Sequence, residues 1–147
     1  MTYFSENPYM EIGENYTRGM LCEYMDIKYC KEEIERGIYK PNKFSSVFFF
    51  STLENPFRYF NGRFSANEFL FSSNRNYLDN MVTQHNLNHN ELILFIRKDE
   101  ETGFYYFGRC KYSGDYRIKG YGYPLYILEL IDTGFSKVKY IEVPLVC

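Results

Sequence analysis

Two adjacent stretches of this chain are apolar on both faces, and they constrain the fold more than any other feature. Residues 91–98 and 104–108 flank a short polar stretch that contains Gly103. The apolar side chains of the first stretch occupy both parities, with Leu92, Leu94 and Ile96 on one and Ile93 and Phe95 on the other. Strict alternation would indicate a strand with one wet face, whereas this pattern indicates a strand covered on both faces. We therefore expect a hairpin at the centre of a barrel or a layered sheet.

Length and composition predict a single domain over residues 1–147. The chain has 16 Tyr and 14 Phe but no Trp. Such an excess of Tyr suits a small core whose edges touch water or a ligand, and an AT-rich coding bias is the alternative explanation. The net charge of −2 argues against binding of duplex DNA by the whole surface, because that binding depends on an excess of Lys and Arg. A local basic patch is compatible with this charge.

Chemical motifs of enzymes and metal proteins are absent from the sequence. The four cysteines are scattered, which predicts reduced thiols in a cytoplasmic protein, and no signal peptide or membrane-spanning run is seen. His85 and His89 are four residues apart but lie in sequence that disfavours a helix, and no third metal ligand is evident. No nucleophile, base and orienting group stand out together. We expect no metal, no cofactor and no catalytic residues.

The remaining segments predict an α+β domain. Two short N-terminal helices are expected, one starting near Thr17 with Asn15 as its cap and one over about residues 31–36. The segments expected to form further strands are 46–52, 68–72, 125–130 and 137–146, the last at a sheet edge because of Pro144. Two helices followed by five or six strands favour a small, curved, mainly antiparallel β-barrel.

An ordered set of sequence blocks resembles a known family. The blocks are 16–18, 37–39, 48–53, 69–74, 94–98, 104–109, 124–125 and 128–130. Over about residues 15–131 the chain resembles the uncharacterised domain at the C-terminal end of bacterial DEAD/DEAH-type helicase and nuclease proteins of restriction-like defence systems. The family usually shows an aromatic-Gln-Ser-Gln signature where this chain has Phe71-Ser72-Ser73-Asn74. The resemblance implies a recognition or docking module without its motor, and by analogy a PUA- or SRA-like barrel that reads modified or flipped bases.

The segment that follows Phe71 contains the side chains that a base-binding site needs. Stacking on Phe71, hydrogen bonds from Ser73 and Asn74 and a phosphate contact from Arg75 would together hold a base. The alternative is a core phenylalanine followed by an ordinary turn, in which Ser and Asn bond to their own backbone.

A second group of predicted ligand-binding residues is basic and aromatic. Arg97 ends the first central strand, and Arg109 and Lys111 share one face of the next strand, with Tyr105 nearby. Such a surface suits a groove that tracks phosphates and stacks bases. The same charges would also serve to block edge-to-edge strand pairing.

These patterns together predict a non-enzymatic DNA-recognition module that reads a modified or flipped base. Its pocket is expected to be lined by Phe71, Ser73 and Asn74 and flanked by Arg97 and Arg109. The alternative is a protein-interaction module or a small inhibitor that binds a helicase or nuclease of such a system.

Overall fold

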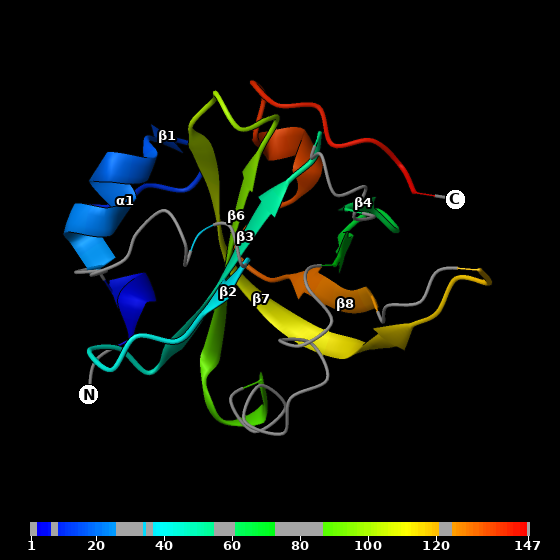
Figure 1. The fold of residues 1–147 in the computed structure, drawn as a ribbon, viewed down its shortest axis with the longest axis horizontal. Helices are drawn as coiled ribbons and strands as arrows, with labels where there is room; N and C mark the ends of the chain where they lie inside the picture. Colours follow the sequence, from blue (N-terminus) through cyan, green and yellow to red (C-terminus); the bar gives the residue numbers. More distant parts are fainter. Residues whose placement is uncertain are drawn as a thin grey trace.

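The computed structural model describes residues 3–6, 9–25, 34, 37–54, 61–72, 87–120 and 125–146. The described residues form a sheet of eight strands, with one α-helix and two 3-10 helices around it (Figure 1). In chain order the elements are η1 (Phe4–Glu6), β1 (Asn15–Tyr16), α1 (Arg18–Met25), β2 (Ile38–Tyr39), β3 (Ser46–Thr52), β4 (Gly62–Arg63), β5 (Glu68–Phe71), β6 (Glu91–Arg97), β7 (Phe104–Tyr116), β8 (Leu125–Leu130) and η2 (Phe135–Lys137). The strand order is β2-β3-β6-β7-β8-β5-β4, and β1 pairs with β7.

The predicted central hairpin is confirmed. Strands β6 and β7 are antiparallel, and every residue of β6 after Glu91 is buried. The two parities of β6 enter two different hydrophobic clusters: Leu92, Leu94 and Ile96 belong to one, and Ile93 and Phe95 to the other. The sheet is therefore the middle layer of the domain, as apolar residues at both parities predicted.

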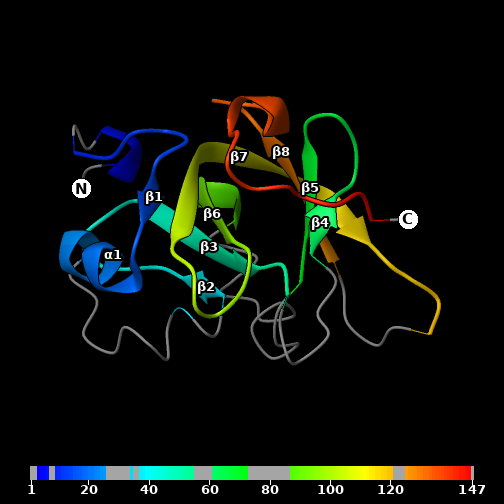
Figure 2. The ribbon, with the colours of Figure 1, turned by 90° about the horizontal axis from the view of Figure 1, so that it is seen from above.

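Two irregularities in β7 allow the sheet to bend. Its pairing with β6 shifts register at Leu94/Phe95, and its pairing with β8 shifts between Tyr112 and Asp115. Gly108 and Gly114 lie at these shifts with φ of 79° and 118°, a region that side chains other than glycine rarely adopt. Bulges of this kind bend a strand and increase its twist. The first half of β7 thus pairs with β6 and the second half with β8, so β8 and β5 fold over one face of the sheet (Figure 2).

The expectation of a closed barrel is wrong. Six of the strand pairs are antiparallel, but β3 and β6 are parallel over their whole length, so the sheet is mixed. Among the described residues, the end strands β2 and β4 do not pair with each other. The sequence does not reveal the parallel pair, because a strand covered on both faces looks the same in either direction.

The N-terminal part of the chain covers one face of the sheet. The first predicted helix is confirmed as α1, with Leu21 and Met25 buried. Its cap is Thr17, whose Oγ1 accepts a hydrogen bond from the Met20 amide at 3.2 Å; the expected cap, Asn15, lies in β1 instead. The second predicted helix lies almost wholly outside the described residues.

The C-terminal segment, residues 138–146, crosses the opposite side of the molecule. It was predicted to be an edge strand, but it makes only a single bridge, between Leu145 and Arg63 (Figure 2). Pro144 contributes a carbonyl, which accepts a hydrogen bond from the Arg63 amide at 2.8 Å, but it has no amide hydrogen to continue a ladder. Val138 and Val143 instead anchor the segment in the core.

One of the two described cysteines differs from the prediction of reduced thiols. Cys22 in α1 is disulfide-bonded. Cys110, the other cysteine in the described part of the chain, is free and buried, so the partner of Cys22 lies outside the described residues. Among the helices that the structure describes, none has the length and apolar character needed to cross a bilayer.

Candidate functional site

The structure places Phe71 in the interior rather than on a ligand-binding surface. Its side chain has no exposed area, and its ring packs edge-on against Phe49 with centroids 4.9 Å apart. The prediction that Phe71 stacks on a base is therefore wrong in this arrangement, because the ring is already enclosed by the core. Ser73, Asn74 and Arg75, which were predicted to hold the base with it, lie outside the described residues.

Arg97 is also enclosed by the fold. It ends β6 with 6% of its surface exposed, and its Nε donates a hydrogen bond to Thr52 Oγ1 at 2.8 Å. The guanidinium lies 4.6 Å from the centroid of the Phe104 ring, within the range of a cation–π contact. These contacts give Arg97 a packing role between β3, β6 and β7.

Arg109 and Lys111 do share an exposed face of β7, as their spacing predicted. They alternate with the buried Cys110, and together with Tyr112 they border a hollow of about 380 Å³. Arg109 forms an ion pair with Asp132, with Nη2 2.7 Å from Oδ1, and its amide also donates to Asp132 Oδ2. Burial raises the pKa of the Asp132 carboxyl, but the hydrogen bonds and charge of Arg109 outweigh it and lower the pKa. Much of the charge of Arg109 is thereby satisfied within the fold.

The predicted pocket does not form from these residues. Phe71 belongs to the cluster with Leu92 and Leu94, whereas Arg109 pairs with Ile93 and so points to the other face of the sheet. Arg97 has the parity of Ile93 and shares that other face. These residues could not be assigned to opposite faces from the sequence, because their relative placement depends on the strand register.

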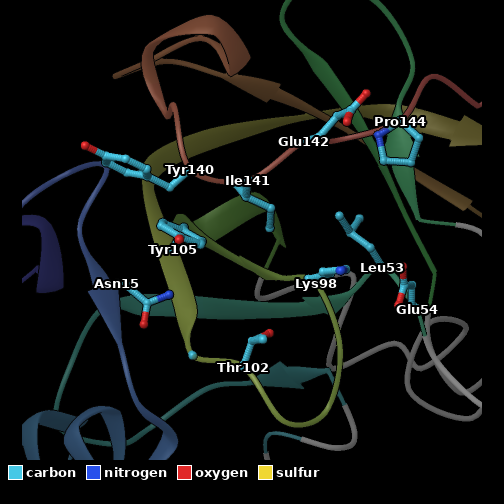
Figure 3. A pocket seen from close by; sticks show the side chains of 11 residues that line it. Asn15, Leu53, Glu54, Lys98, Thr102, Tyr105, Tyr140, Ile141, Glu142 and Pro144 are labelled. Atoms are coloured by element: carbon cyan, nitrogen blue, oxygen red, sulfur yellow. The ribbon is translucent and has the colours of Figure 1, made fainter.

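A different hollow collects residues from four separate parts of the chain (Figure 3). Its volume is about 840 Å³, and it lies between the β6–β7 turn and the C-terminal segment. The lining residues are Asn15, Leu53, Glu54, Lys98, Thr102, Gly103, Tyr105, Tyr140, Ile141, Glu142 and Pro144. We call this hollow the Tyr105 pocket. It includes one predicted site residue, Tyr105.

The apolar part of the Tyr105 pocket is the open edge of a core cluster. Leu53, Tyr105 and Ile141 are partly buried and pack against the cluster that contains Ile96, the cross-strand partner of Tyr105. Figure 3 shows Ile141 pointing from the C-terminal segment into the hollow beside Tyr105. The pocket is therefore bordered by an aromatic side chain that packs against the core.

Polar groups surround this apolar surface. Gly103 lets the β6–β7 turn approach Asn15, since a Cβ there would collide with the Asn15 side-chain oxygen and lie 3.0 Å from the Tyr16 carbonyl. Lys98, Glu54 and Glu142 contribute one positive and two negative charges, which leaves the pocket with a local charge of −1. Such a site suits a ligand with an apolar planar part and hydrogen-bond donors more than an isolated anion.

Most of this pocket could not be recognised in the sequence. Asn15, Leu53 and the residues from Tyr140 to Pro144 are far apart in the chain, and no motif links them. The one available signal was the excess of Tyr, which predicted aromatic rings at the edges of the core.

Comparison of the whole chain with protein-family models and with curated proteins finds no match. The resemblance to the helicase- and nuclease-associated domain therefore remains a prediction. Within the described residues, no group of three or more His, Cys, Asp and Glu side chains is placed to hold a metal ion.

Proposed function

We propose that this protein is a non-enzymatic recognition module that receives a nucleobase, modified or flipped out of DNA, in the Tyr105 pocket. The observation that carries the proposal is the combination of one core-anchored tyrosine with hydrogen-bonding side chains around a hollow of about 840 Å³. Pockets that bind small molecules commonly have a volume of this order and combine apolar surface with a few polar groups. The proposal also draws on the analogy with PUA- and SRA-like domains, which read modified or flipped bases.

The side chains around Tyr105 match the chemistry of a base. Its ring offers a stacking surface, which is worth about 1–3 kcal/mol per base in nucleic-acid complexes. The amide of Asn15 and the hydroxyl of Thr102 can pair with the hydrogen-bonding edge of a base, and Glu54 can accept hydrogen bonds from an exocyclic amino group. The local charge of −1 favours the base itself over its phosphate.

A titration with DNA duplexes tests the proposal. One duplex is fully paired, and the other has an abasic site opposite a single base, which lowers the cost of extruding that base. We expect tighter binding to the second duplex and a loss of about 5-fold to 150-fold with Tyr105→Leu, equivalent to the stacking energy. Tyr105→Phe keeps the ring and is expected to keep most of the affinity.

Tyr116→Leu is the matched control, because Tyr116 lies on the same strand but outside the pocket. Equal affinity for both duplexes, or equal losses with Tyr105→Leu and Tyr116→Leu, would refute the proposal.

A second candidate function is protein interaction, and a separate surface favours it. Tyr3, Tyr9 and Tyr24 border a hollow of about 620 Å³ near the N-terminal part of the chain. Tyr3 and Tyr9 are 48% and 74% exposed, and exposed tyrosines are enriched at protein interfaces. A pull-down that retrieves a helicase or nuclease would support this function instead, provided that the retrieval persists after nuclease digestion of the sample and is lost with Tyr9→Ser.

A further inference from the structure

The C-terminal segment separates the Tyr105 pocket from a second hollow of opposite charge. This second hollow has a volume of about 720 Å³ and shares Tyr140, Ile141, Glu142 and Pro144 with the Tyr105 pocket. We call it the Arg63 hollow, after the cation that β4 contributes to it. One short segment thus borders two neighbouring recesses.

The charges of the two hollows differ in sign. Arg63 and Lys139 line the Arg63 hollow, and Lys98 and Glu54 line the Tyr105 pocket. Glu142 borders both hollows, and when it is counted in each, the local charges are +1 and −1. In the described part of the chain, neither Arg63 nor Lys139 has a carboxylate within ion-pair distance. Both positive charges are therefore available to an anionic ligand.

Arg63 is held in place by its surroundings. Its amide donates a hydrogen bond to the Pro144 carbonyl at 2.8 Å, and its own carbonyl accepts one from the Val146 amide at 2.8 Å. Its guanidinium carbon lies 5.9 Å from the centroid of the Phe135 ring, so the side chain lies along η2. The hydroxyl of Ser136 and the ammonium of Lys139 border the same hollow. A guanidinium, an ammonium and a hydroxyl are the groups that commonly contact phosphate oxygens.

We infer that the Arg63 hollow holds the phosphate backbone of a nucleic-acid strand whose base enters the Tyr105 pocket. The inference rests on the proposed function and adds the path of the strand, which crosses the C-terminal segment at residues 140–144. The base is then bound on one side of the C-terminal segment, in the Tyr105 pocket, and the phosphate on the other side, in the positively charged Arg63 hollow. Arg63 and Lys139 account for up to two phosphate contacts.

The dependence of affinity on salt concentration tests this inference. Neutralising two phosphates of a single strand gives a slope of about −1.4 in log K against log salt, or about sevenfold weaker binding between about 50 and about 200 mM. For binding of a short single-stranded oligonucleotide, we expect the slope of log K against log salt to become less negative by about this amount in the double variant Arg63→Gln/Lys139→Gln. Arg63→Lys/Lys139→Arg keeps both charges and is expected to keep most of the slope.

Matched controls separate charge from folding. Lys111→Gln removes one exposed charge on β7, outside both hollows, and is expected to leave the slope unchanged. Arg63 also packs on Phe135, so its substitution removes a packing contact as well as a charge. Lys139 lies in an exposed turn, and Lys139→Gln alone is expected to produce about half of the change in slope.

Binding of a free nucleoside distinguishes failure of this inference from failure of the proposed function. A nucleoside has no phosphate, so its affinity is expected to depend on Tyr105 and not on Arg63 or Lys139. If nucleosides do not bind but the oligonucleotide slope still depends on Arg63 and Lys139, the phosphate site stands and the base pocket fails. An unchanged slope in the double variant, or no measurable oligonucleotide binding, overturns the inference.

Discussion

The rings of Phe49 and Phe71 meet edge to face with centroids 4.9 Å apart and planes at 83°, although three strands separate β3 from β5 in the sheet. This contact is made because the bulged strand β7 turns the second half of the sheet over the first. The core between the two halves therefore depends on aromatic side chains from both of them. The same bend leaves Tyr105 at the open edge of this core, where the C-terminal segment completes the pocket.

Substitution of Phe71 tests its assignment to the core. We expect Phe71→Ala to lower the free energy of unfolding by about 3–5 kcal/mol, as is usual for a buried phenylalanine, and Phe71→Leu to cost less. Denaturant unfolding measures both values. Folded Phe71→Leu protein is expected to bind DNA like the wild type. If a folded Phe71→Leu variant lost DNA binding, the result would indicate that Phe71 takes part in the binding site.

Gly62 is expected to be necessary for the position of the C-terminal segment. A Cβ at Gly62 would collide with the Val146 side chain and lie 2.7 Å from the Pro144 carbonyl oxygen. Gly62→Ala should therefore displace the segment and increase hydrogen exchange at the amides of Arg63 and Val146, which bond across this contact.

Gly134→Ala is the control for this change. Gly134 has a negative φ of −115°, and a Cβ there would meet no atom within 4 Å. Equal exchange rates in the wild type and Gly62→Ala would show that the segment does not depend on this close approach.

The Arg109–Asp132 pair predicts a dependence of stability on acid pH. Because the pKa of Asp132 is lowered in the folded state, its stabilisation is present above its unfolded pKa of about 3.9 and is lost as the pH falls through the folded value. Asp132→Asn is expected to destabilise the protein by only about 0.5–1 kcal/mol at pH 7, because Arg109 is 46% exposed and solvent screens the pair, with a smaller difference from the wild type at pH 2. Urea unfolding at several pH values measures this difference.

The exposed turn residue Glu101 provides a matched change of charge for comparison, and Glu101→Gln is expected to have little effect at any pH. A constant difference between Asp132→Asn and the wild type down to pH 2 would contradict the assigned role of the carboxylate.

The disulfide at Cys22 predicts a defined number of reactive thiols. The chain has four cysteines, so one disulfide leaves two thiols that react after denaturation without reductant and four after reduction. Burial raises the pKa of the Cys110 thiol, so this thiol is expected not to react while the protein is folded. Thiol titration under the three conditions tests this, and four reactive thiols without reductant would contradict the disulfide.

Most of the longer strands of this fold could be predicted from local patterns. The two-residue strands β1, β2 and β4 and the extension of β7 to Tyr116 were not predicted. Apolar residues at both parities located β6 between two layers, and the runs at β3 and β8 have the predicted bounds. The parallel pairing of β3 with β6 could not be predicted, since it depends on the path of the chain between residues 52 and 91. The C-terminal segment alternates like a strand, but only Val138 and Val143 are buried in the core, and the segment has no continuous partner strand.

The position of the candidate site could not be predicted from the sequence. Tyr105 lines a pocket, and its role in ligand binding stays a prediction, whereas Phe71 and Arg97 resemble ligand-binding residues in sequence but are used for packing. The sequence around a phenylalanine or arginine at the end of a strand looks the same whether that residue binds a ligand or packs in the core. Only the strand register shows that Arg109 and Phe71 lie on opposite faces.

The most direct test of the Tyr105 pocket is chemical-shift mapping of the whole protein with the abasic-site duplex. Entry of a base into the Tyr105 pocket predicts that the largest amide shifts occur at Thr102, Gly103, Tyr105 and Ile141, and that Tyr105→Leu removes them. The largest shifts at Arg109 and Lys111 instead, or no shift that depends on Tyr105, would contradict it.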